Sequence, residues 1–184
     1  SVRAVDYAGN RSTPFTSNQW QVSDLQQNLP ELILWLDSSD KLSILDSNSN
    51  NADSMTFNSR VNQWLDISNS TYPHDFRAVS ADAEPYYSNE AVFFNGSNHF
   101  FTTDNHTEIN TSTVSEKNIS FAFRTENNID ATQVIYEEGG TVRGMNIYVS
   151  EGRLYCGFCN VTNDGDGGQP FLSASTPISR NKTY

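Results

Sequence analysis

The sequence predicts an all-β protein, on three observations. Short apolar segments alternate with turn-rich polar segments along the 184 residues. Several of these segments alternate apolar and polar residues with the period of two that is typical of a half-buried strand. No segment carries the sustained i, i+3, i+4, i+7 apolar spacing of an amphipathic helix. Many short strands separated by Gly and Asn turns indicate an antiparallel sandwich or jelly roll.

The first half of the chain contains short apolar runs bounded by turn residues. Residues 32–37 (LILWLD) form such a run, which favours a buried strand. We expect further strands at residues 60–68, 91–96 and 99–103.

The second half alternates more clearly. Residues 118–125 place Ile119, Phe121 and Phe123 on one face of a predicted strand. Residues 133–138 and 144–150 flank Gly139-Gly140, a pair that favours a hairpin turn. In the second strand of this hairpin Met145, Ile147 and Val149 point one way, and residues 152–158 continue the meander.

Three spaced motifs carry a family resemblance. The run LILWLD is followed by V-x-x-W-x-D-x-S at residues 61–68 and by V-x-F-x-G-S at residues 92–97. Their order resembles the laminin G-like, concanavalin A-like lectin/glucanase superfamily, and residues 133–158 are similar to the paired central strands of its bacterial cell-surface members. The resemblance implies a two-sheet antiparallel jelly-roll sandwich over residues 31–184. Members usually continue with further strands, so we expect the sandwich to be incomplete at the C-terminus, with open edges.

The N-terminal segment indicates a second domain. Residues 1–15 resemble the last strand and exit turn of a fibronectin type III or bacterial Ig-like domain, and the alternative is an arbitrary first strand of the main domain. Residues 16–30 are polar and aperiodic, as expected of a linker.

The charge narrows the classes of partner. A formal net charge of -11 argues against nucleic acid, because such a surface repels phosphates. It suits calcium, a sugar or another extracellular protein. The longest apolar run, residues 32–36, falls short of the roughly 20 residues that a spanning helix needs, so no membrane insertion is expected. The Asn-, Ser- and Thr-rich composition, with eight N-x-[ST] sequons, fits a secreted or cell-surface protein.

The carboxylates argue against an enzyme. Because the superfamily includes glycoside hydrolases, a pair of catalytic carboxylates about 5 to 5.5 Å apart has to be sought. The adjacent Glu137 and Glu138 would face opposite sides of a strand, and we expect them at a solvated strand end. Asp37, Asp40 and Asp66 are expected to cap backbone amides at turns. We therefore predict a chain without hydrolase activity of its own.

Neither the histidines nor the cysteines suggest a catalytic or metal site. His74, His99 and His106 lie in loop-like or strand-edge positions without ligand spacing, so each is expected to be an ordinary surface or half-buried histidine. Cys156 and Cys159 lie three apart within an alternating strand, so they should face opposite sides, unbridged. The alternative is a disulfide across a local bulge or turn.

Calcium is the one cofactor that the sequence suggests. Asn163, Asp164 and Asp166 place oxygen ligands in a glycine-rich loop, as Ca²⁺ prefers. The superfamily resemblance implies the same ion, since calcium near the sandwich rim is common there. The alternative is a flexible hairpin tip. Residues 45–53 are a second, weaker candidate loop.

For a glycan ligand the candidate platforms are tyrosines. Tyr148 and Tyr155 fall on strand faces opposite their apolar neighbours, and residues 86–87 hold two more tyrosines in a predicted loop. They could stack on a sugar ring, or they could simply reflect β propensity. The sequence thus predicts a non-catalytic carbohydrate-binding or adhesion module of a secreted or cell-surface multidomain protein. The alternative is an accessory or degenerate domain of a glycoside hydrolase whose catalytic residues lie elsewhere.

Overall fold

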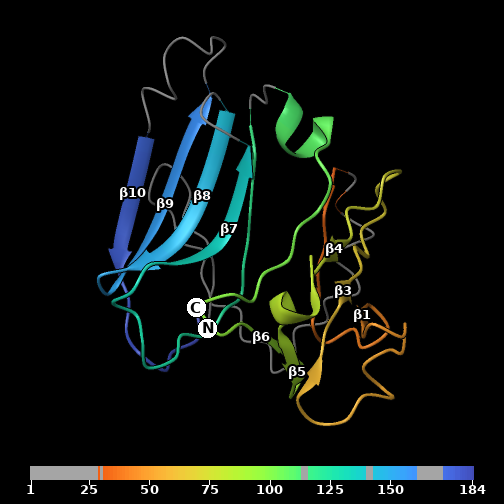
Figure 1. Cartoon of the computed structure of the whole chain (residues 1–184). Coiled ribbons are helices and arrows are strands. Elements are labelled where there is room, and N and C mark those ends of the chain that lie inside the picture. The colour runs from red at the N-terminus through yellow and green to blue at the C-terminus, as the bar shows by residue number, and fades with distance from the viewer. Residues whose placement is uncertain (1–28, 30, 113–115, 140–142, 161–171) are drawn as a thin grey trace, which may run out of the picture.

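The computed structural model describes residues 29, 31–112, 116–139, 143–160 and 172–184 (Figure 1). Within these ranges the chain is built of β-strands, one 3₁₀ turn and one turn of π-helix. In chain order the elements are β1 (Ile44–Leu45), β2 (Ser59–Arg60), β3 (Gln63–Trp64), β4 (Phe76–Arg77), η1 (Ala81–Ala83), β5 (Tyr86–Ser88), β6 (Ala91–Phe93), η2 (Thr107–Thr111), β7 (Gln133–Gly139), β8 (Arg143–Ser150), β9 (Arg153–Asn160) and β10 (Leu172–Pro177).

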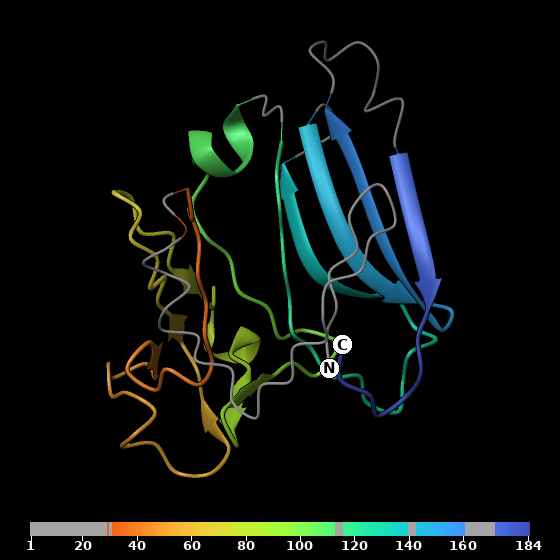
Figure 2. The ribbon, with the colours of Figure 1, turned by 180° about the vertical axis from the view of Figure 1, so that it is seen from behind.

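The strands form three antiparallel sheets. The largest has the order β10-β9-β8-β7, and two smaller sheets have the orders β1-β3-β4 and β2-β5-β6. The four-stranded sheet curves along one side of the molecule, while the small sheets and their connecting loops form the other side (Figures 1 and 2). The π-helical turn η2 lies beside the β7 edge, toward the small sheets, in both views. The predicted all-β class is thereby confirmed, and the jelly-roll arrangement stays a prediction.

The four-stranded sheet follows the predicted alternation. Ile147 and Val149 on β8 are buried, and Tyr148 between them points to the opposite face. β7 pairs with β8 as the predicted hairpin, with a bulge between Val134 and Tyr136 that bends the strand. The expected meander is therefore confirmed from β7 to β9.

Two hairpins turn through left-handed backbone. Asn89 and Glu90, with φ of 50° and 59°, join β5 to β6, and Glu151 and Gly152, with φ of 50° and 70°, join β8 to β9. Two positive φ values in a two-residue connection define a type I′ turn, whose twist matches that of the flanking strands. A glutamate in this region is strained, because its Cβ approaches the next carbonyl oxygen.

Apolar burial is divided between two clusters. The first gathers Ile44, Ala52, Val61 and Tyr87 beneath the small sheets, with Met55, Trp64, Val92 and Phe101 packed against it. The second gathers Ile129, Val149 and Ile178 against the four-stranded sheet, with Phe123, Ile135 and Leu154 around it. Each part of the molecule thus buries its own apolar residues.

Five predicted strands are shorter or less regular than expected. Residues 32–37 form no ladder with the other described residues. The Trp35 amide donates to the Asp66 carboxylate, the Trp35 carbonyl accepts the Ile67 amide, and the Asp37 carbonyl accepts the Asp40 amide within a local turn. Within residues 60–68, strand structure is limited to the last residue of β2 and to β3. Within residues 91–96, it is limited to β6. Residues 99–103 and 118–125 make isolated bridges, Arg77 with Thr102 and Arg124 with Thr183. Side chains and single bridges here take the place of the continuous ladders that alternation predicts.

Two further predictions concern the N-terminal segment and the membrane. The predicted domain tail at residues 1–15 and most of the predicted linker at 16–30 lie outside the described residues. Among the helical turns that the structure does describe, none is long and apolar enough to cross a membrane.

Candidate functional site

A pocket of about 520 Å³ opens beside the β5–β6 turn. That volume falls in the range of roughly 300 to 1,000 Å³ in which small-molecule sites occur. Its walls come from the segment before β1, the loop between β1 and β2, the end of β5 and the type I′ turn. The lining residues are Lys41, Ala52, Met55, Thr56, Phe57, Tyr87, Ser88, Asn89 and Glu90.

The pocket combines one aromatic ring with several polar groups. The Phe57 side chain is 74% exposed, so its ring is available to a ligand. Asn89 and Glu90 bring an amide and a carboxylate on the strained turn, and Lys41 forms an ion pair of 3.8 Å with Asp53. The turn itself is held by the Ser38 hydroxyl, which donates to the Glu90 carbonyl at 2.7 Å.

One residue that lines the pocket has a buried hydroxyl without a partner among the described residues. Ser88 is buried, and its Oγ makes no hydrogen bond to any of them. A buried hydroxyl without a partner costs about 1 to 3 kcal/mol of folding free energy, and a side-chain rotation that brought this hydroxyl to a polar ligand in the pocket would recover that cost.

Tyr87 forms a fixed wall of the pocket. Its hydroxyl donates to the Ser38 carbonyl at 3.0 Å. Burial raises the pKa of Tyr87, and the nearby carboxylates of Glu90, Asp53 and Asp37 raise it further. The phenol therefore stays neutral and keeps this hydrogen bond across the physiological pH range.

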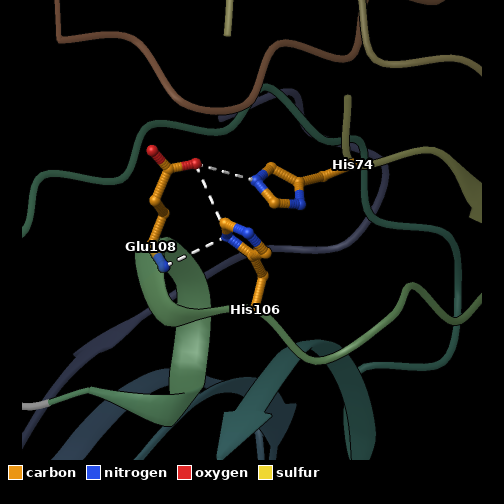
Figure 3. A group of neighbouring side chains, drawn as sticks. All are labelled: His74, His106 and Glu108. Carbon is orange, nitrogen blue, oxygen red and sulfur yellow. Dashed lines mark hydrogen bonds and ion pairs between the residues drawn. The ribbon is translucent and has the colours of Figure 1, made fainter. Parts of the chain in front are cut away.

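A second polar cluster joins His74, His106 and Glu108 (Figure 3). The Glu108 Oε2 atom lies 3.5 Å from Nε2 of His74 and 3.5 Å from Nδ1 of His106. The two imidazole rings lie 5.0 Å apart, centroid to centroid, and the Tyr72 ring lies 4.9 Å from that of His106. Figure 3 shows both imidazoles turned toward the one carboxylate.

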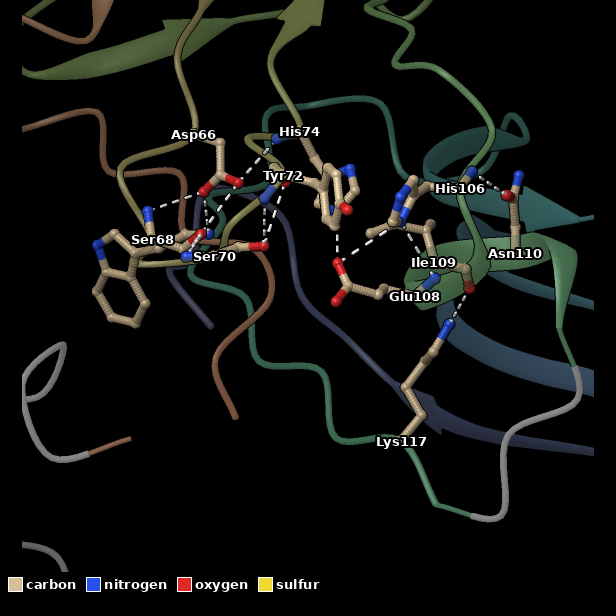
Figure 4. Close-up of polar contacts among 11 residues, drawn as sticks. Asp66, Ser68, Ser70, Tyr72, His74, His106, Glu108, Ile109, Asn110 and Lys117 are labelled. Carbon is tan, nitrogen blue, oxygen red and sulfur yellow. Dashed lines mark hydrogen bonds and ion pairs between the residues drawn. The ribbon is translucent and has the colours of Figure 1, made fainter. Parts of the chain in front are cut away.

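His74 is positioned by a buried aspartate (Figure 4). The His74 backbone amide donates to Asp66 Oδ2 at 2.9 Å, and the same carboxylate accepts the Ser68 amide and hydroxyl and the Trp35 amide. This bonding confirms that Asp66 caps backbone amides, as predicted. Asp37 and Asp40 do the same for Ser39 and Leu42.

The other two members of the cluster belong to η2. His106 precedes the turn as its cap, with Nδ1 accepting the Glu108 amide at 3.3 Å, and its own amide donates to Asn110 Oδ1 at 3.0 Å. Lys117 donates to the Ile109 carbonyl at 2.6 Å and pairs with Glu138 on β7. Figure 4 shows the contact of Lys117 with Ile109, and the ion pair with Glu138 fastens the turn that carries the cluster to the four-stranded sheet.

The histidine prediction is wrong for His74. Its side chain is 4% exposed, rather than lying at the surface or half-buried. The sequence shows only His106-x-Glu108 as a local pair, and His74 joins it through the fold. His106 is half-buried, as predicted, and His99 lies near Arg60, whose Nη1 is 3.1 Å from His99 Nε2. Burial, first, and then the Arg60 charge lower the pKa of His99.

The predicted glycan platform lies on the four-stranded sheet, away from the pocket residues. Tyr148 and Tyr155 are direct cross-strand partners, and their rings stack 4.8 Å apart with an interplanar angle of 6°. Each ring therefore offers only its outward face to a ligand. The prediction that these tyrosines bind a ligand is left open. Tyr86 and Tyr87, predicted in a loop, lie on β5.

Glu138 departs from its prediction, whereas Glu137 follows it. The two face opposite sides of β7, as expected, and Glu137 is exposed. The Glu138 side chain, however, is 9% exposed, because it accepts the Tyr136 hydroxyl at 2.6 Å and pairs with Lys117. It is therefore a buried, partnered carboxylate and not part of a solvated strand end.

The remaining predicted sites are placed only in part. Cys156 is free, and both cysteine positions fall on β9 at an odd separation, as the strand prediction requires. The predicted calcium ligands Asn163, Asp164 and Asp166 lie outside the described residues, so that site stays a prediction. The weaker calcium candidate, residues 45–53, is a turn in which Asp46 accepts the Asn48 and Asn50 amides.

Comparison with protein-family models, with curated proteins and with solved structures gave no match to this chain.

Proposed function

We propose that this chain is a non-catalytic glycan-binding module that holds a neutral sugar in the pocket between Phe57 and Glu90. In this proposal the module has a concanavalin A-like jelly-roll fold and works outside the cell, secreted or on the cell surface. The observation that carries the proposal is a pocket that presents an exposed aromatic ring and is lined by Ser88, whose buried hydroxyl has no hydrogen-bond partner among the described residues.

The chemistry of the pocket fits a sugar. A pyranose ring has an apolar face that packs on an aromatic ring, and Phe57 supplies such a ring. Sugar hydroxyls both donate and accept hydrogen bonds, which suits the Asn89 amide, the Glu90 carboxylate and the Ser88 hydroxyl. Lys41 adds a donor to the same wall.

Charge favours a neutral ligand over an acidic one. The chain carries a net charge of -11, and Glu90, Asp53 and Asp37 all act on Tyr87 at the pocket. This negative potential would repel an acidic sugar, whereas it would not repel a neutral sugar.

The pocket does not support hydrolysis. Glu90 is the one carboxylate among the described residues that line it, whereas glycoside hydrolysis uses two carboxyl groups flanking the scissile bond. A non-catalytic module therefore fits this pocket better than a hydrolase does. The alternative is that the chain is an accessory domain of a glycoside hydrolase.

The test begins with a glycan array on the whole chain, followed by calorimetry with the strongest neutral hit. Phe57→Ala should weaken binding about tenfold, since a stacked ring contributes on the order of 1 kcal/mol beyond its buried area. Phe100→Ala is the matched control, because Phe100 is also an exposed phenylalanine but does not line the pocket.

Ser88→Ala separates binding from folding. It removes a buried hydroxyl that has no partner in the described part of the chain, so the melting temperature should stay the same or rise while sugar affinity falls. Binding that survives Phe57→Ala and Ser88→Ala but is lost in Tyr155→Ala would move the site to the predicted tyrosine platform. An array without any hit would leave the glycan proposal without support.

A further inference from the structure

We propose that His74, His106 and Glu108 form a zinc site that fastens the small-sheet part of the molecule to η2 and the four-stranded sheet. This inference is independent of the glycan pocket, because the three residues do not line that pocket. It goes beyond the predicted calcium loop as well, since it involves other residues and another class of metal.

The distances fit a single small cation. Two ligands at about 2.0 to 2.1 Å from zinc, at a tetrahedral angle, are separated by about 3.3 to 3.4 Å. The two ion-pair distances to Glu108 Oε2 are 3.5 Å each, and all three ligand atoms lie within 4.8 Å of one another. His106 and Glu108 are partly exposed, so their side chains can rotate to close the third separation.

The buried histidine points to a ligand. His74 is 4% exposed, and its Nε2 atom makes no hydrogen bond to any described residue, although it faces Glu108. Within the same described ranges the Glu108 Oε2 atom also lacks a hydrogen-bond partner. A buried nitrogen and a buried oxygen, both unsatisfied and both aimed at one point, are costly unless something binds between them.

The donor set selects the metal. Two imidazole nitrogens and one carboxylate oxygen suit zinc, whereas calcium and magnesium take six or more oxygen ligands. Three protein ligands leave a fourth tetrahedral position for water. The Nδ1 lone pair of His106 is held only by the long 3.3 Å bond from the Glu108 amide, so a metal can compete for it.

The neighbours of the site hold its ligands in place. Asp66 fixes the His74 backbone, and Asn110 fixes that of His106. His74 lies just before β4 in the small sheets, while η2 is tied to β7 through Lys117 and Glu138. A metal between them would therefore cross-link two parts that otherwise have separate apolar clusters.

The experiment uses the full chain, freed of any purification tag, with zinc chloride as the probe. Calorimetry should show one zinc ion per chain, and the melting temperature should be higher in zinc than in EDTA, because binding to the folded state stabilises it. Glu108→Gln and His106→Gln should each weaken zinc binding by about 100-fold or more, since even residues that only support a ligand change affinity by about 10- to 100-fold.

Matched controls keep the result specific. Glu137→Gln and His99→Gln change the same residue types elsewhere and should leave the zinc-dependent shift intact. The series is made in a Cys156→Ser, Cys159→Ser background, because thiolates bind zinc. Circular dichroism of each metal-free variant checks that it folds. An equal zinc-dependent shift in wild type, Glu108→Gln and His106→Gln would overturn the proposal, as would the absence of any shift in wild type.

Discussion

At the scale of single residues, the half-buried cluster of Lys117, Glu138 and Tyr136 sets an upper pH limit on stability. Burial, first, and then the hydrogen bond to Glu138 raise the pKa of Tyr136 far above its usual range. Tyr136 is thus held in its neutral form in the folded chain. In the unfolded chain the same phenol ionises near pH 10.

The sign of the pH dependence follows from proton counting. Between about pH 10 and the raised folded pKa, the folded state holds one proton more on Tyr136 than the unfolded state. The free energy of unfolding should therefore fall as the pH rises above about 10, by about 1.4 kcal/mol per pH unit from this group. Urea denaturation at a series of pH values from about 9 to about 11 measures the slope.

Tyr136→Phe should remove that contribution, at a cost of about 1 kcal/mol near neutral pH for the lost hydrogen bond to Glu138. Tyr72→Phe is the control, because it makes the same change of residue type at an exposed tyrosine. An unchanged alkaline slope in Tyr136→Phe would contradict this account.

At the scale of elements, the β8–β9 hairpin contains a correctable strain. Glu151 has a φ of 50° in the type I′ turn that it forms with Gly152. Asn tolerates this left-handed conformation better than Glu, and Asn-Gly is the preferred pair in such turns. The hydrogen bonds that anchor the turn, Glu151 N to the Asp130 carbonyl and Gly152 N to the Ile129 carbonyl, are made by the backbone.

Glu151→Asn should consequently raise the free energy of unfolding by on the order of 0.5 to 1 kcal/mol, because it relieves strain without changing those backbone bonds. The midpoint of urea denaturation is the measurement. Glu137→Asn, on the exposed face of β7, is the matched control and should give no gain, since Asn is depleted in strands. A lower midpoint for Glu151→Asn than for wild type would show that the turn is not strained as described.

At the scale of the whole molecule, the net charge and the division of the buried apolar residues into two clusters both affect stability. The chain has 22 acidic and 11 basic residues, so it repels itself at low ionic strength. The two apolar clusters offer no single core that would offset this repulsion. Salt screens charges over a Debye length of about 8 Å at 0.15 M.

The melting temperature should therefore rise between about 0.01 M and about 0.15 M sodium chloride. A triple variant, Glu31→Gln, Glu116→Gln and Glu137→Gln, neutralises three exposed carboxylates and should depend less on salt. A melting temperature that falls with added salt in wild type would mean that ion pairs such as Arg180 with Asp130, at 2.6 Å, outweigh the overall repulsion.

The sequence by itself determined the features that depend on neighbouring residues. The alternation of β8 and β9, the β7–β8 hairpin and the capping role of Asp66 could all be predicted, because side-chain period and turn chemistry act over a few residues. The net charge and its consequences also follow from composition alone.

Only the tertiary structure decided which distant residues meet. Residues 32–37 alternate too little to reveal that the Trp35 amide donates to Asp66, so the predicted strand forms no ladder with the other described residues. The ion pairs of His74 with Glu108 and of Lys117 with Glu138 form through long-range packing. No periodic pattern in the sequence predicts them. The pocket, likewise, needs the loop before β2 to lie against the β5–β6 turn. Such contacts depend on how sheets pack, and local propensity does not specify that packing.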